Sequence, residues 1–141
     1  MIDIFPKVFS DVYTAVTTVN ANANVVDVTP ERLAEYPAVI LRETNNVPIE
    51  RTNTVESSEN YTRITVELDV RSNKANGAEA EARALFEAAE NALKNLFFRR
   101  IWGRKLPAQD RTIYRMYGSY EVICRAPFES GDNTIYQLYR R

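Results

Sequence analysis

The stretch YTRITVELDVR at residues 61–71 decides the fold class of this chain. Its apolar and polar side chains alternate, which is the pattern of a β-strand with one buried and one solvated face. The buried face is expected to carry Ile64, Val66, Leu68 and Val70. The solvated face is expected to carry Thr65, Glu67, Asp69 and Arg71.

The sequence after this strand predicts a long helix over residues 78–100. Apolar and small residues recur there at spacings of three and four, which is the period of a helix that buries one stripe. Acidic residues at its start, and Arg99 and Arg100 at its end, would match the helix dipole. We expect this helix to pack on the sheet in one core with Leu85, Ala89, Leu93, Val66 and Leu68.

The region before the strand predicts a first layer of elements and a long polar connection. Helical periodicity and proline placement indicate a helix at 4–20 and a short helix at 30–35. Apolar runs indicate strands at 25–28 and 38–43. Residues 44–60 are mainly polar and predict a long loop or a projecting hairpin.

The C-terminal region predicts three consecutive strands after a connector at 103–110. Gly118-Ser119 is typical of a tight hairpin between the first two of them. The strands are expected at 112–117, 120–126 and 134–139. Consecutive strands favour antiparallel pairing, so the fold class is α+β in a single domain, 1–141. We expect a mixed, mostly antiparallel β-sheet with two main α-helices packed on one face and a long projecting loop or hairpin.

The residue types that are missing exclude most catalytic chemistry. The 141 residues include no histidine, one cysteine and four glycines. Histidine-based catalysis, zinc and iron–sulfur sites and glycine-rich phosphate loops are therefore excluded. We expect no enzyme, no cofactor and no metal, and we expect Cys124 to lie in the core. No apolar run is long enough for a membrane span, no secretory leader is expected, and the single cysteine suits a reducing cytoplasm.

Two groups of residues nevertheless allow a functional interpretation. Glu67 and Asp69 lie two apart on one strand face, where paired carboxylates could hold magnesium or carry out acid–base chemistry. The favoured interpretation is the solvated face of an amphipathic strand. Residues 97–105 interleave aromatic and basic side chains, which is typical of nucleic-acid or protein docking. The competing interpretation is a helix end with a buried Trp102.

The charge is distributed unevenly along the chain. Residues 1–98 carry nine basic and fifteen acidic side chains, whereas residues 99–141 carry nine basic and four acidic ones. This asymmetry suggests head-to-tail self-association or two different partners, unless solvated faces have merely segregated. We hypothesise that residues 44–60 are mobile in the free subunit and become ordered on a partner. The candidate contact residues are Val47, Ile49, Glu50, Arg51 and Val55, and their complementary surface is Arg99, Arg100, Arg104 and Arg115.

The order of these elements resembles the tail terminator and tail-completion proteins of tailed bacteriophages. The resemblance begins with VFSDVY at 8–13 and the proline-led PAVI at 37–40. After the polar segment come TVELDVRS at 65–72, a short turn and the alanine-rich helix. IYR at 113–115 and YEVI at 120–123 end the pattern. It covers nearly the whole chain and concerns element order rather than a diagnostic motif.

This resemblance implies a structural virion protein. Identical subunits would close into a ring, expected to be a hexamer, that caps the tail and joins it to the head connector. The implied partners are further copies of the chain, a tail tube or sheath protein and a head connector or adaptor protein. DNA would pass through the ring without specific binding, no membrane would be involved, and assembly would take place in the host cytoplasm.

Two other functions remain open at this point. One is a stand-alone α+β module that binds a small ligand or a protein, which would have a closed apolar pocket. The other is a carboxylate–metal enzyme built on Glu67 and Asp69, which would need further acids nearby.

Overall fold

The computed structural model describes residues 3–27, 35–49, 61–106, 113–125 and 136–137. Two helices lie in this part of the chain, α1 (Phe5–Val19) and α2 (Ala78–Asn95). The strands are β1 (Asn24–Val26), β2 (Ala38–Pro48), β3 (Tyr61–Ser72), β4 (Arg99–Leu106), β5 (Tyr114–Arg125) and β6 (Tyr136–Gln137). The predicted short helix at 30–35 and the candidate residues Glu50, Arg51 and Val55 lie almost entirely outside the described residues.

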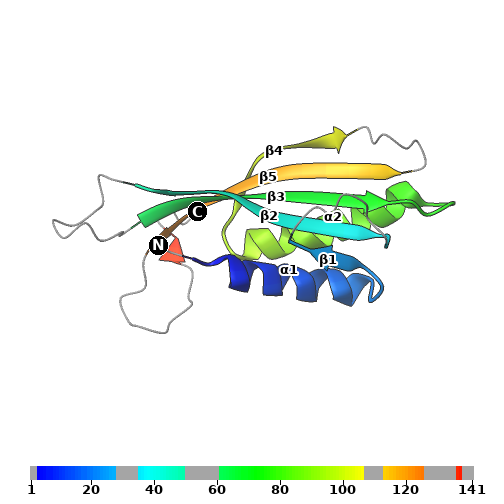
Figure 1. Ribbon diagram of the computed structural model, residues 1–141, viewed down its shortest axis with the longest axis horizontal. Coiled ribbons are helices and arrows are strands. Elements are labelled where there is room, and N and C mark those ends of the chain that lie inside the picture. Colours follow the sequence, from blue (N-terminus) through cyan, green and yellow to red (C-terminus); the bar gives the residue numbers. More distant parts are fainter. Residues whose placement is uncertain (1–2, 28–34, 50–60, 107–112, 126–135, 138–141) are drawn as a thin grey trace.

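The strands form one sheet in the order β1-β2-β3-β5-β4, and β6 pairs with the end of β5. Only the pairing of β1 with β2 is parallel, and the other pairings are antiparallel. Both helices lie on one side of the sheet (Figure 1), where α2 packs against α1 and, within the sheet, against β3 and β5. The predicted α+β class, with a mixed and mostly antiparallel sheet, is confirmed.

The core lies between the helices and the sheet. The four apolar positions of β3 are buried there together with Leu85, Ala89 and Leu93 of α2, as predicted. Val8, Val12 and Val16 of α1 complete this cluster at a spacing of four residues, which keeps them on one stripe. Cys124 is also buried in it, as expected. Neither described helix is long and apolar enough to span a membrane.

The prediction of one helix to residue 100 is wrong, because α2 ends at Asn95. Phe97 adopts a left-handed conformation with φ 69°. The backbone N–H groups of Phe97 and Phe98 donate to the carbonyls of Lys94 and Leu93, which is the bonding pattern of a Schellman helix end. Glycine is usual at that position, so this stop gave no signal in the sequence. Arg99 and Arg100 therefore begin β4 instead of capping a helix.

The predicted hairpin at Gly118-Ser119 is also wrong, because both residues lie inside the continuous strand β5. Gly118 faces the helices, and a Cβ atom there would lie 2.9 Å from the Tyr120 ring and 3.1 Å from Phe86. The glycine is thus required for close packing rather than for a turn. Its partner strand β4 takes up residues 103–106 of the predicted connector.

The polar segment 44–60 begins as strand rather than loop. β2 continues to Pro48 and stays paired with β3, with a register shift between Glu43 and Asn45. Thr44 is the extra residue of this bulge, and its hydroxyl donates to the Thr65 carbonyl at 3.3 Å. The described part of the segment is therefore the end of β2 that leads into the connection to β3, and the two strands pair as a hairpin.

Candidate assembly surface

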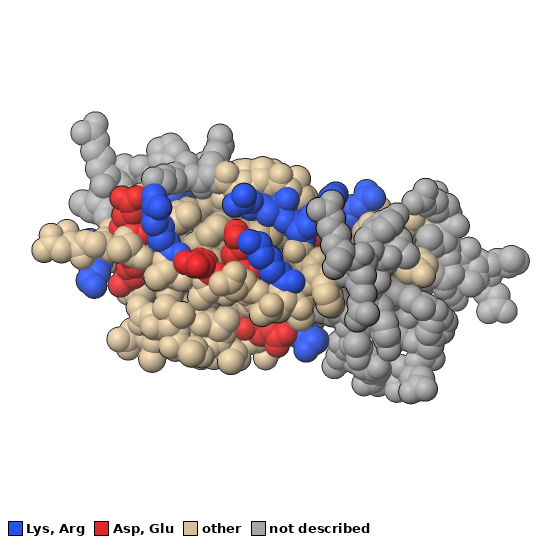
Figure 2. Space-filling model, turned by 180° about the vertical axis from the view of Figure 1, so that it is seen from behind, with Lys and Arg blue, Asp and Glu red and all other residues tan. Residues whose placement is uncertain are grey.

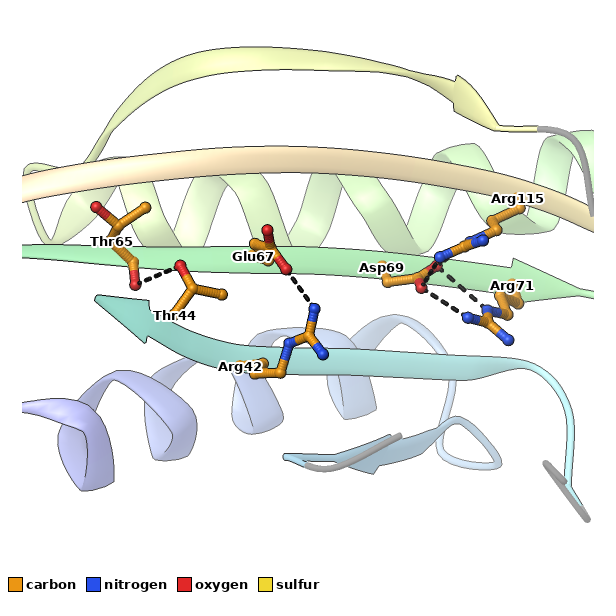
Figure 3. Close-up of polar contacts among 7 residues, drawn as sticks. All are labelled: Arg42, Thr44, Thr65, Glu67, Asp69, Arg71 and Arg115. Carbon is orange, nitrogen blue, oxygen red and sulfur yellow. Dashed lines mark hydrogen bonds and ion pairs between the residues drawn. The ribbon is translucent and has the colours of Figure 1, made fainter. Parts of the chain in front are cut away.

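The sheet has a second face, opposite the helices, on which charged side chains gather. Strand register places Arg42 opposite Glu67, and Arg71 opposite Arg115. Figure 3 shows these side chains on the same face of β2, β3 and β5. We call the group the arginine–carboxylate face, and it consists of Arg42, Glu67, Asp69, Arg71, Arg115, Glu121 and Arg99.

Asp69 is the centre of this face. Arg115 donates to it through Nε and Nη2 at 2.9 and 2.7 Å, and Arg71 does so at 3.3 and 2.9 Å (Figure 3). The carboxylate is thus held from two sides by bidentate contacts, and Asp69 is only 6% exposed. Arg71 and Arg115 lie directly opposite each other, and Asp69 offsets the repulsion between these like charges. The hydrogen bonds to Asp69 raise the pKa of Arg115.

Glu67 takes part in a second group on the same face. Its carboxylate pairs with the guanidinium of Arg42, and this contact raises the pKa of Arg42. Burial, together with hydrogen bonding to Glu67, raises the pKa of Tyr117 to about 12. Arg42, Glu67 and Tyr117 therefore connect β2 with β5 across β3, and the phenol stays neutral at physiological pH.

The strand β4 is an edge strand of the sheet and pairs with β5. Arg99 pairs with Glu121 directly across from it on β5. The Trp102 ring stacks on Tyr117 with centroids 5.0 Å apart. A register shift between Arg100 and Trp102 makes Ile101 an extra residue of a bulge, and bulges often re-aim side chains for function. Trp102 is 43% exposed, so the interpretation that it is buried at a helix end is wrong.

Two glutamates, Glu90 on α2 and Glu43 on β2, lie on the helix-covered side of the sheet and have different surroundings. Burial favours the neutral form of Glu90, but hydrogen bonds from Tyr120 and Lys94 and nearby positive charges outweigh it and lower its pKa. Glu43 has a weaker set of partners, and burial raises its pKa. Burial and the bond to Glu90 also raise the pKa of Tyr120. These groups belong to the inner packing of the molecule and not to its open surface.

The structure separates the residues that the sequence singled out. Glu67 and Asp69 share a face as predicted, but each is occupied by arginine rather than open to a metal ion. Arg99, Arg100 and Arg104 lie on β4, whereas Arg115 is held by Asp69 on β5. Two further candidates, Val47 and Ile49, lie at the base of the β2–β3 hairpin, and the backbone N–H of Ile49 donates to the Tyr61 carbonyl.

Sequence reasoning missed Arg42 and Tyr117 as members of this surface. Alternation within β2 could have placed Arg42 on the same face as Ile40, but it could not identify the glutamate that faces it. The sequence pattern places Tyr117 at the end of a short strand before a turn. Only the register of β5 against β3 brings its ring beside Glu67 and Trp102.

The ion pairs of the arginine–carboxylate face limit the chemistry that this surface can carry out. Every carboxylate on the arginine–carboxylate face is bonded to an arginine, and the four arginines exceed the three carboxylates by one positive charge. Asp69 and its two arginines are mostly buried as well as paired, so the centre of this face is held in position and presents a surface of mixed charge. This arrangement suits docking against a macromolecule better than proton transfer or metal binding.

Comparison with known proteins shows that this chain is similar to solved structures but not to known sequences. No family model and no curated protein sequence matches this chain. A chain in the virion of a native gene transfer agent particle superposes with a TM-score of 0.53 and 9% identity, over 82% of this chain and 92% of that one. A sheath/tube terminator of an extracellular contractile injection system, in the extended state, superposes with a TM-score of only 0.33 and 12% identity. That second match covers 92% of this chain and 64% of the other. The first likeness shows that this chain has the fold of a known virion component.

Proposed function

We propose that this chain is a structural virion protein of the tail-terminator type. The observation that carries the proposal is the fold it shares with a chain of a gene transfer agent virion, over 92% of that chain. The element order that resembles phage tail terminators supports the same function. A non-catalytic role agrees with the pairing of Glu67 and Asp69 to arginines.

The proposed assembly is a closed ring of identical subunits, with six as the expected number. A ring requires two unlike surfaces on each subunit that bind each other head to tail. The chain offers such a difference between its acidic first part and its basic last part. In the proposal the ring caps the tail tube or sheath and faces the head connector, and DNA passes through it without specific contacts.

The test is the mass of the purified protein under native conditions, with and without the tail tube protein. A ring former gives a discrete species at about six times the subunit mass of 16.2 kDa, alone or when tail tube protein is added. Electron microscopy should show that species as an annulus. A protein that stays monomeric under both conditions and does not bind tail ends would contradict the proposal.

The alternative of a ligand-binding module predicts a closed apolar pocket. A hollow of 290 Å³ lies between the end of α1 and the start of α2, lined by residues such as Val19, Gly77 and Leu85. It is open to solvent, so it does not favour that alternative. A small-molecule thermal-shift screen on the monomeric protein would reveal such binding as a raised melting temperature.

A further inference from the structure

Six large hydrophobic side chains are exposed among the described residues, and four of them lie at two places. Phe97, Ile101 and Trp102 lie within six residues of one another at the start of β4, and Tyr13 lies on α1 with its ring stacked on Phe9. Val19 at the end of α1 and Val47 on β2 are not grouped with these. Groups of exposed apolar side chains mark interaction surfaces more often than isolated ones do.

The first place is a basic border of the sheet, which we call the β4 edge and define by Arg99, Ile101 and Trp102. Ile101 is 49% exposed in the bulge, and Trp102, the next residue in the chain, is 43% exposed. The strand reads RRIWGRKL, with four basic residues and no acidic one. Only β5 pairs with β4 in the described structure. Tryptophan and arginine are the residue types most enriched at the energetic centres of interfaces.

The second place is the helix layer formed by α1 and α2. Phe5, Phe9 and Tyr13 form an aromatic ridge along α1, with ring centroids 6.1 and 6.4 Å apart, and Tyr13 is 49% exposed. Seen from behind in Figure 2, charged side chains form a band over α2, while the region over α1 is mainly uncharged.

The helix layer carries an excess of negative charge. Its two helices contain five acidic and three basic residues. The basic ones are each paired within a helix, as Lys7–Asp11, Arg83–Glu79 and Lys94–Glu90. Glu81 and Glu87 account for the excess. A basic partner surface would therefore be attracted to this layer.

We infer that the β4 edge of one copy of this chain docks on the helix layer of the next copy. This inference rests on the proposed ring and identifies its subunit contact. Ile101 and Trp102 would pack against the Tyr13 end of the aromatic ridge, and the net positive charge of the strand β4 would be attracted to the excess negative charge of the helix layer. Because β4 and α1 lie at opposite borders of the molecule (Figure 1), the contact leaves a free copy of each surface and passes from subunit to subunit.

The test uses two variants that each disable one surface with the same new side chain. Ile101→Lys adds a charge at the apolar centre of the β4 edge, and Tyr13→Lys does so on the helix layer. Each variant alone should weaken assembly about tenfold or more, and so remain monomeric where the wild type assembles. An equimolar mixture should form a heterodimer of twice the subunit mass in native mass spectrometry, because one intact surface of each kind remains.

Val19→Lys is the matched control, since Val19 is 54% exposed on α1 but is not part of the aromatic ridge. It should assemble like the wild type. Circular dichroism and thermal melting confirm that each variant is folded, and Tyr13→Ser and Ile101→Ser replace any variant that is not.

Three results would overturn the inference. Assembly of both folded variants like the wild type would show that neither surface is used. A mixture that stays monomeric would show that the two surfaces do not bind each other, although the ring itself could stand. A wild type that never assembles, with or without tail tube protein, would refute the ring and the contact together.

Discussion

The two faces of β3 are held by different forces, although they alternate along one strand. On the helix side, Ile64, Val66, Leu68 and Val70 are almost fully buried among apolar neighbours. On the other side, Glu67 and Asp69 are paired with arginines from three strands. Apolar burial contributes most of the free energy of folding, whereas an ion pair with a half-exposed partner, such as Arg42–Glu67, contributes little. The open face can therefore be shaped for a partner while the helix side maintains the fold.

The largest expected effect comes from opening a cavity on the helix side. Leu85 of α2 is 1% exposed in the main cluster, so Leu85→Ala should lower the free energy of unfolding by about 2–5 kcal/mol. Urea unfolding followed by circular dichroism measures this change. Val19→Ala on an exposed site should change stability by less than about 0.5 kcal/mol. A similarly small effect at Leu85 would show that the helix stripe does not maintain the fold.

The next effect concerns the most buried group of the open face. Asp69→Asn leaves Arg71 and Arg115 opposite each other without a carboxylate between them, which should cost about 1–3 kcal/mol. Adding Arg115→Gln to Asp69→Asn should restore part of that loss, because it removes one of the two facing charges. If Asp69→Asn is as stable as the wild type, the ion pairs of Asp69 do not contribute to the free energy of unfolding, which contradicts this prediction. Stability would then come from the helix side of β3.

A smaller, pH-dependent effect is expected from Glu90 on the helix side. Its pKa is lowered in the folded protein from an ordinary value of 4.5, so its contribution is present at neutral pH. That contribution is lost as the pH falls below 4.5 and through the lower folded value. Glu90→Gln should therefore be less stable than the wild type by about 1 kcal/mol at neutral pH. The difference between the two proteins should shrink as the pH falls through that range, and a constant difference would exclude this assignment.

The smallest effect on stability is expected at the border of the open face. Arg99 pairs with Glu121, but its side chain is 74% exposed, so Arg99→Ala should change the free energy of unfolding by about 0.5 kcal/mol or less. The same variant should assemble measurably less well than the wild type if the β4 edge is a subunit contact. Chemical unfolding and native mass spectrometry on one preparation separate the two effects. A large loss of stability would mean that the border, like the core, maintains the fold.

The sequence-based predictions that are confirmed rest on the regular spacing of apolar residues within one helix or strand. The alternation in residues 61–71 and the stripes of α1 and α2 reflect burial of one face, so core residues such as Leu85 and Val66 could be predicted. It was wrong where a residue had an unusual use. Phe97 ends α2 in a conformation that glycine normally adopts, and Gly118 provides space for Tyr120 inside a strand. The use of Gly118 also depends on Phe86, a neighbour that is distant in the sequence.

By itself, the amino-acid sequence determined the α+β class, the two helices and the buried face of β3. The sequence also showed that the first part of the chain is acidic and the last part basic, because charged residues can be counted without knowing the fold. Only the tertiary structure decided that Asp69 lies between Arg71 and Arg115, that Arg42 faces Glu67, and that Trp102 stands exposed on an edge strand. The physical reason is strand register. A shift of one residue moves every side chain of a strand to the other face, and that register is fixed by long-range packing.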